Sequence, residues 1–135
     1  MRALIDTNVI MDVLFSREEF IEPAARLWLA NEEGRFEGYV SAITPVNVFY
    51  IARREKNANV ARELIAEILS TFHVCPLDIS ELQAAMSLPL EDYEDAVQVA
   101  SALSVGLDAI VTRNTADYRK SPLAIFTPAE FLAKL

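Results

Sequence analysis

The sequence predicts an α/β protein, a three-layer α/β/α sandwich with a parallel sheet of about five strands. Apolar runs of three or four residues alternate with longer segments whose apolar residues recur at helical spacing. Strands that alternate with helices in this way form parallel sheets that helices cover on both faces. The 135 residues contain no repeat, low-complexity tract or linker. We therefore expect a single domain over residues 1–135.

The first third of the chain predicts one strand and two helices. Ala3–Ile5 is a short apolar run that ends at Asp6, which is typical of a buried strand followed by a polar turn. A helix is expected over Val9–Phe15. In Phe20–Glu33 the apolar residues again stand at helical spacing, and Gly34 ends this second helix.

The middle of the chain predicts two more strands and two more helices. Tyr39–Ser41 is a short apolar strand. The helix Thr44–Arg54 opens with threonine as its N-cap and proline at its first helical position. Asn59–Ser70 has the pattern of an amphipathic helix. Phe72–Val74 is the third strand.

The last third of the chain predicts three helices and two strands. Ser80–Ser87 is a short helix, and Glu91–Val105 is a helix that is acidic in its first turn and apolar afterwards. Ala109–Thr112 and Ala124–Phe126 are the fourth and fifth strands. Thr127–Glu130 is a capping box with proline at the first helical position, so the last helix begins there.

Composition narrows the possible class of protein. Hydrophobic residues make up 53% of the chain, and the mean hydropathy is +0.22, so a sizeable core is expected. No apolar run approaches the roughly 18–20 residues of a membrane span, and the acid at position 6 argues against a signal peptide. The single cysteine, Cys75, permits no internal disulfide and favours a cytoplasmic location.

Charge and residue counts exclude several kinds of site. The net charge of −8 has the wrong sign for broad neutralisation of phosphates. It indicates either an ordinary acidic surface or carboxylates gathered around a cation. His73 is the only histidine, which excludes a multi-histidine zinc site. None of the three glycines forms a Gly-rich phosphate loop, which excludes a Rossmann-like or flavodoxin-like cofactor protein.

Polar side chains gather at one edge of the predicted sheet. The carboxyl ends of parallel strands and the amino ends of the helices share an edge, and ligands bind there. Oxygen ligands suit hard cations such as Mg²⁺ or Mn²⁺. The residues that the prediction places at this edge are Asp6, Thr7, Asn8, Thr44, Asn47, Glu91, Asp92, Glu94, Asp95, Arg113, Asn114 and Asp117.

Two of these acids have a structural alternative to metal binding. Asp6 is either a metal ligand or a cap for the helix that follows it, with Thr7 and Asn8 closing the turn. Asp117 is either a ligand or an ordinary loop acid, and Thr112 and Asn114 would then only hold the loop through bonds to its backbone. No single residue decides between these interpretations, but their convergence on one edge favours a metal site.

The acids near residue 95 are the third group. Acids in the first turn of a helix are favoured by the helix dipole alone. Asp95 differs because Val99 and Ala102 lie four and seven residues further on, so this carboxylate heads an apolar face. A half-buried carboxylate needs a partner or an ion. Asp95 is therefore the favoured ligand of this helix, and Asp92 is a second candidate.

In order along the chain, five segments resemble the motifs of PIN domains. Leu4–Val9 resembles the opening motif, and Ser41–Thr44 resembles the second. Asp92–Ala96 and Ile110–Tyr118 resemble the third and fourth motifs, and Phe126–Leu132 resembles the typical ending. Each motif is short, but the ordered set spans nearly the whole chain and is quite specific.

This resemblance implies a fold and an activity. PIN domains have a three-layer sandwich around a parallel sheet, and active members are metal-dependent ribonucleases. Many are toxins paired with a small antitoxin, as in the VapC group. The resemblance implies Asp6, Asp95 and Asp117 as catalytic and metal-binding acids, Mg²⁺ or Mn²⁺ as cofactor, RNA as substrate and a homodimer. Asn114 stands where some members place the last acid.

The second motif departs from the family pattern. It usually carries a glutamate three residues after the threonine, where this sequence has Asn47. An amide is a neutral ligand, so either Asp92, Glu91 or Asp12 compensates, or the site is slow or inactive. Arg113, placed near the site, is expected to contact a substrate phosphate.

Two other functions remain as alternatives. Asn47 motivates the first, a PIN-fold binding module that is weak or inactive as a catalyst. The second is a receiver-like signalling domain, which also binds Mg²⁺ through aspartates. A receiver needs an acceptor aspartate directly after its third strand and a lysine after its fifth. Here Asp78 comes too late, and no basic residue directly follows Phe126.

Overall fold

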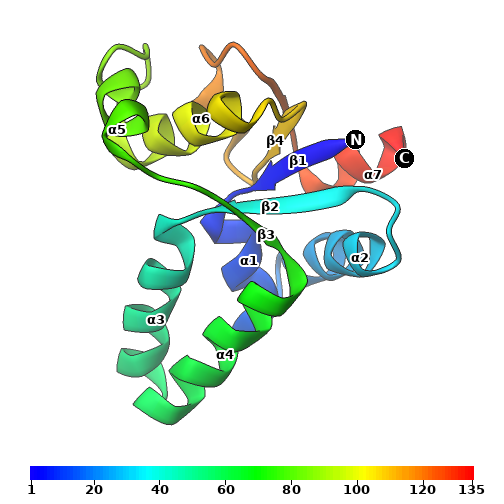
Figure 1. Cartoon of the computed structure of the whole chain (residues 1–135). Helices are drawn as coiled ribbons and strands as arrows, with labels where there is room; N and C mark the ends of the chain where they lie inside the picture. The colour runs from blue at the N-terminus through cyan, green and yellow to red at the C-terminus, as the bar shows by residue number, and fades with distance from the viewer.

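Five parallel strands form the centre of the computed structural model, which describes all 135 residues (Figure 1). Their order in the sheet is β3-β2-β1-β4-β5, and every neighbouring pair is parallel. The predicted α/β class and the parallel sheet of five strands are therefore confirmed. The strands are β1 (Arg2–Ile5), β2 (Glu37–Ser41), β3 (His73–Cys75), β4 (Ala109–Val111) and β5 (Ala124–Phe126).

Seven α-helices and one short 3₁₀ helix accompany the strands, and the last helix follows β5. None of them combines the length and the apolar character that crossing a membrane requires. The helices are α1 (Thr7–Leu14), α2 (Ile21–Glu32), α3 (Ile43–Glu55), α4 (Ala58–Thr71), α5 (Ile79–Met86), α6 (Tyr93–Val105), the 3₁₀ helix η1 (Thr115–Tyr118) and α7 (Pro128–Lys134).

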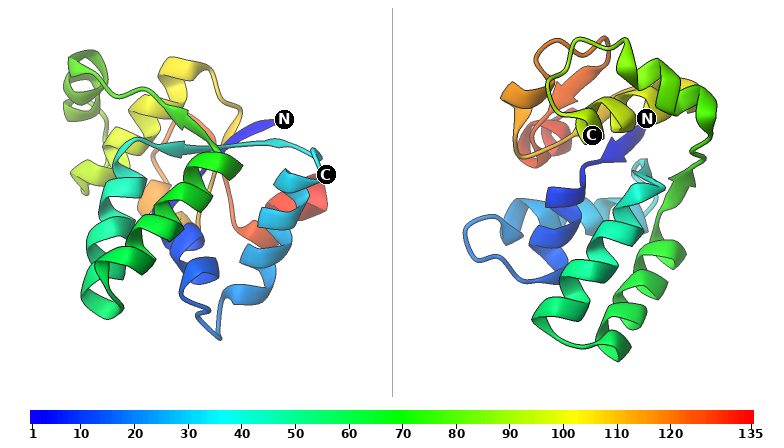
Figure 2. Two further views of the ribbon diagram at one scale, coloured as in Figure 1. Left: turned by 60° about the horizontal axis from the view of Figure 1, so that its bottom comes forward. Right: turned by 90° about the vertical axis from the view of Figure 1, so that its left-hand side faces the viewer.

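Helices cover both faces of the sheet, as Figures 1 and 2 show. Side chains of a strand alternate between the two faces, so Ala3 and Ile5 of β1 enter one core and Leu4 enters the other. The first core joins β1, β2 and β4 to α1, α2, α3, α4 and α7. The second core lies under α6, where Val99 and Ala102 pack on Leu4.

Two predicted helix ends have the residues that the sequence assigned to them, and one predicted N-cap was wrong. The capping box of Thr127 and Glu130 opens α7, and Gly106 ends α6 with a positive φ of 76°. Thr44 is not an N-cap, because α3 already begins at Ile43 after Ala42, and no side chain caps it. The hydroxyl of Thr44 instead bonds the hydroxyl of Thr7 at 2.8 Å in the buried interior.

Gly38 in β2 is a point of close approach between the sheet and α2. The Asn31 side chain accepts a hydrogen bond from the Gly38 N–H at 2.8 Å and donates one to the Thr71 carbonyl at 3.0 Å. A Cβ on Gly38 would stand 2.9 Å from Asn31 Oδ1 and 2.9 Å from Phe72 Cδ1. Only glycine fits here without displacing these two side chains.

Gly38→Ala is therefore expected to lower the free energy of unfolding by about 1–3 kcal/mol, the usual range for overpacking. Urea titration followed by circular dichroism measures the change. A midpoint equal to that of the wild type would show that Asn31 and Phe72 move aside at no cost.

Candidate active site

The switch in strand order between β1 and β4 sets the position of the candidate site. The chain builds β1, β2 and β3 outwards on one side and then returns to place β4 and β5 on the other. Ligands of open α/β sheets bind at such a point, beyond the carboxyl ends of the strands. Asp6 follows β1 and Thr112 follows β4. The Asp6 N–H donates to the Val111 carbonyl at 2.9 Å, so the pairing continues into the site.

Asp6 is a buried carboxylate with two hydrogen-bond donors and one further polar contact, to the Tyr118 hydroxyl. Its Oδ1 accepts from Gln98 Nε2 at 2.9 Å, and its Oδ2 accepts from Thr112 Oγ1 at 2.7 Å and lies 3.3 Å from the Tyr118 hydroxyl. The residue is only 6% exposed. Asp6 occupies the N-cap position of α1, but its side chain makes no capping hydrogen bond, so helix capping does not engage the carboxylate. These contacts hold the carboxyl group at the end of β1.

The Tyr118 hydroxyl links Asp6 to Asp95. It accepts from Gln98 Nε2 at 2.7 Å and lies 2.9 Å from Asp95 Oδ1. Because a phenol has one proton, the shorter contact identifies Asp95 as its acceptor. Burial and the charges of Asp6 and Asp95 raise the pKa of Tyr118 far above its usual range, so the group stays a donor. Asp95 is thereby fixed relative to Asp6.

The sequence interpretation missed Tyr118 and Gln98. Tyr118 ends the segment that resembles the fourth PIN motif, but the sequence analysis gave it no role of its own. Gln98 had a signal, because it is a polar residue in the apolar part of its helix, three residues after Asp95. Both are about 1% exposed, and their polar groups supply the donors that the two acids need.

Uncompensated negative charge marks this region. Burial raises the pKa of Asp95 to about 6, and the charges of Asp6, Asp92 and Asp117 add to this, against a lowering by the Tyr118 bond. Burial, Asp92 and Asp6 also raise the pKa of Glu94. The two ion pairs of the structure both belong to Asp12, so no basic side chain neutralises these acids.

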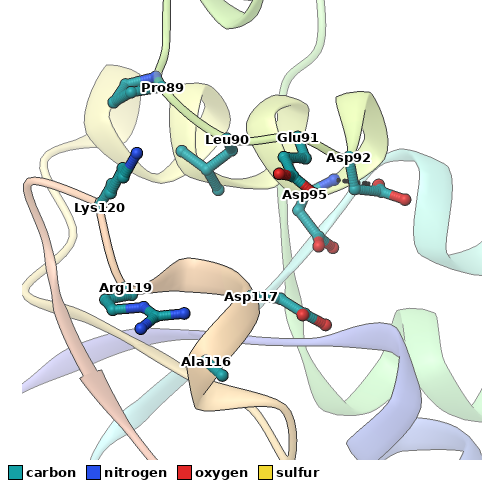
Figure 3. A pocket seen from close by; sticks show the side chains of 9 residues that line it. All are labelled: Pro89, Leu90, Glu91, Asp92, Asp95, Ala116, Asp117, Arg119 and Lys120. Atoms are coloured by element: carbon teal, nitrogen blue, oxygen red, sulfur yellow. Dashed lines mark hydrogen bonds between the residues drawn. The ribbon is translucent and has the colours of Figure 1, made fainter.

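Two adjoining hollows meet at Asp95 and Asp117. The first hollow, about 440 Å³, contains most of the predicted site residues. The second, about 520 Å³, is drawn in Figure 3, where Asp95 comes from α6 and Asp117 from η1 on facing sides. The first is lined by Asp6, Thr7, Asn8, Met11, Asn47, Tyr50, Ile51, Glu94, Asp95, Asn114 and Asp117. The second is lined by Pro89, Leu90, Glu91, Asp92, Asp95, Ala116, Asp117, Arg119 and Lys120.

Other predicted residues lie beside the first hollow with different contacts. Asp92 caps α6 by accepting from the Asp95 N–H at 3.0 Å and lines only the second hollow. Thr112, which supports Asp6, also accepts from the Asn114 N–H at 3.0 Å. Asn114 and Asp117 both line the first hollow, so either one can face an ion there.

Arg113 forms an ion pair with Asp12 and lines neither hollow. Its Nε and Nη2 donate to the two carboxylate oxygens at 2.9 and 3.1 Å, and its guanidinium lies 4.0 Å over the Phe20 ring. Arg17 also pairs with Asp12 at 3.5 Å. Arg113 could contact a phosphate only by giving up these bonds to Asp12. Asp12, 1% exposed and already paired with two arginines, is not free to replace the acid missing at position 47.

The donor set fits a hard divalent cation in its chemistry. The polar groups that line the first hollow are carboxylates, amides and hydroxyls, whose oxygens suit such an ion. One of the lining residues, Asn8, has a buried Oδ1 without a hydrogen-bond partner. In their present orientations no three acidic side chains come close enough to share one ion. The surplus negative charge nevertheless favours a cation, and Asp6, Asp95 and Asp117 are the residues that would hold it.

Taken together, the fold and the site define an α/β/α domain that gathers carboxylates at the switch point of a parallel sheet. Residues 2–116 match the sequence profile of the PIN domain. The chain belongs to the PIN domain family, whose members are usually nucleases, and not to the receivers. No curated protein matches the chain significantly.

Solved structures with the same fold come from toxin–antitoxin complexes. A chain of the DNA-bound VapBC complex from Salmonella typhimurium is 20% identical with a TM-score of 0.72, covering 95% of this chain and 98% of its own. A chain of the Klebsiella pneumoniae toxin–antitoxin complex is 28% identical with a TM-score of 0.69, covering 93% and 97%. A chain of VapBC2 from Rickettsia felis, bound to a promoter DNA fragment, is 14% identical with a TM-score of 0.71, covering 93% and 97%.

The raised pKa of Asp95 predicts a pH dependence of stability in the metal-free protein. The folded carboxyl binds its proton at about pH 6, against an ordinary value of 3.8. The unfolding free energy should therefore fall as the pH rises from about 4 to about 6, because only the folded state keeps this proton. Asp95→Asn should lack this part of the slope and melt at a higher temperature than the wild type at pH 7.

Thermal melts in a chelator at several pH values measure the effect. The amide can still accept from Tyr118, so the comparison isolates the charge. If the stability of the two proteins changes with pH in the same way between pH 4 and 7, the assignment of the raised pKa to Asp95 is wrong.

Proposed function

We propose that this chain is a metal-dependent endoribonuclease that hydrolyses RNA phosphodiester bonds and acts as the toxin of a toxin–antitoxin pair. The observation that carries the proposal is the first hollow, which is lined by Asp6, Asp95 and Asp117 from three separate segments with no basic partner. Membership of the PIN family and the 28% identity to a chain of a toxin–antitoxin complex support it.

Asp6 and Asp95 would have different roles in such a site. A bound Mg²⁺ or Mn²⁺ would supply positive charge and Lewis acidity, which let an anionic phosphodiester approach these carboxylates. Asp6 is held rigid by Gln98 and Thr112. Tyr118 bonds Oδ1 of Asp95 and leaves Oδ2 without a protein donor. That oxygen can take a proton from an attacking water, a step for which no histidine is needed.

Positive charge near the site supports a path for the RNA backbone through the second hollow. Arg119 and Lys120 line the second hollow, opposite Glu91 and Asp92, and are exposed (Figure 3). The two hollows share Asp95 and Asp117, so a strand that passes through the second reaches these acids. Arg119 and Lys120 are therefore better placed to bind phosphate than Arg113, which Asp12 already occupies.

Asn47 favours one second candidate, a PIN-fold binding module with weak or no catalysis. This side chain replaces the expected acid with an amide, and it lines the first hollow. Such a protein would bind metal or RNA without cutting the RNA.

A decisive experiment titrates Mn²⁺ and Mg²⁺ into the purified protein by calorimetry and assays the same samples on single-stranded RNA. We expect binding and cleavage in the wild type and loss of both in Asp6→Asn and in Asp95→Asn. Loss of a catalytic carboxylate should lower the rate by about 100-fold or more. Binding without cleavage would favour the binding module, and no binding at millimolar ion would exclude the enzyme.

We also propose a small antitoxin protein as partner, a homodimeric assembly and a cytoplasmic location. The matched structures are complexes of toxin with antitoxin, two of them with DNA, and they support the partner. Size-exclusion chromatography with light scattering at micromolar concentration should give twice the 15.1 kDa mass of the chain. A mass of one chain would contradict the homodimer and leave the nuclease proposal intact.

A further inference from the structure

We propose that Glu94 supplies the carboxylate that position 47 lacks, and that Asn47 and Glu94 act as one unit in binding the divalent cation. The inference rests on the proposed metal-dependent function. Glu94 would be the residue that contacts the ion, and Asn47 would be the residue that positions it.

The contact between the two side chains carries the inference. Asn47 lies in the first turns of α3, and Glu94 lies in the first turn of α6. Asn47 Nδ2 donates to Glu94 Oε1 at 2.7 Å across 47 positions of sequence. An amide nitrogen can donate only to an acceptor, so the bond holds a carboxylate against position 47. Glu94 Oε2 has no protein donor and remains available to an ion.

The other candidates for this role are already engaged or lie elsewhere. Asp12 is buried between Arg17 and Arg113. Asp92 caps α6, and Glu91 lines only the second hollow. Glu94 alone among the four lines the first hollow together with Asp6, Asp95 and Asp117.

The surroundings of Glu94 are those of an ion ligand and not of an ordinary helix acid. It is exposed to solvent at the rim of the hollow, so an ion can reach it. No lysine or arginine pairs with it. It lines the same hollow as Asp6, Asp95 and Asp117, and a hard divalent cation is the ligand that balances the charge of four carboxylates there.

The consequence concerns the charge of the site. Asp6, Asp95 and Asp117 give three carboxylates, and Glu94 gives the fourth that the asparagine at position 47 removes. The fourth carboxylate thus comes from α6 instead of α3, but it still lies beside position 47. The asparagine then serves as the donor that directs this acid towards the hollow.

An isosteric exchange tests the unit. Glu94→Gln removes the charge, and the double variant Asn47→Asp with Glu94→Gln returns one charge at position 47. In the double variant the new amide at position 94 can donate to the new carboxylate at position 47, so the hydrogen bond is reversed while shape and total charge stay those of the wild type. Glu63→Gln, an exposed acid on α4, is the matched control for loss of a single charge.

Calorimetric titration of Mn²⁺ into each folded protein is the main readout, with RNA cleavage as the second. We expect Glu94→Gln to weaken Mn²⁺ binding by about tenfold or more, and the double variant to regain most of that affinity. Glu63→Gln should bind as the wild type does. Circular dichroism in chelator confirms that all four proteins are folded.

The outcomes separate this inference from the proposed function. Wild-type binding and cleavage with unchanged affinity in Glu94→Gln would overturn the inference alone. A double variant that stays as weak as Glu94→Gln would overturn the claim that the pair acts as a unit. Absence of Mn²⁺ binding in the wild type would overturn the proposed function and the inference with it.

Discussion

The buried carboxylate of Asp6 is the constraint on which the rest of the site depends. It stands where β1 ends beside β4, and a buried carboxyl group there needs polar partners from other parts of the chain. Thr112 comes from the end of β4, Gln98 from α6 and Tyr118 from η1. These three contacts fix α6 and η1 against the sheet edge. Asp95 and Asp117 are brought to the same hollow as a result.

Two kinds of acid occur in this small domain, those paired with arginine and those without a basic partner, and the difference distinguishes structural from functional carboxylates. Asp12 is 1% exposed and has two arginines, which is how a structural acid is accommodated. Asp95 and Glu94 have no basic partner, and their raised pKa values reflect burial together with neighbouring negative charges. Leaving these acids without a basic partner costs stability. Such acids are characteristic of sites that bind a cation or a substrate.

Much of the fold and part of the site follow from sequence because they depend on local pattern. The strands and helices came from apolar periodicity, and Asp6, Asn47, Asp95 and Asp117 were correctly placed at one edge of the sheet. The capping role of Thr44 was predicted wrongly because a buried hydroxyl and a cap have the same local sequence. The donors Tyr118 and Gln98 and the pairing of Arg113 depend on contacts between distant segments, which no local pattern encodes.

The same limit explains why Asn47 looked like a loss when the motif was considered alone. A motif assigns a charge to a position in the sequence, whereas an ion responds to charge in space. Positions 47 and 94 are adjacent only because α3 and α6 both begin at the carboxyl edge of the sheet. An acid on either helix reaches the same hollow, so the fold permits the charge to move between them. What the site must conserve is then the number of carboxylates around the hollow, and the amide at position 47 is what keeps the relocated one in place.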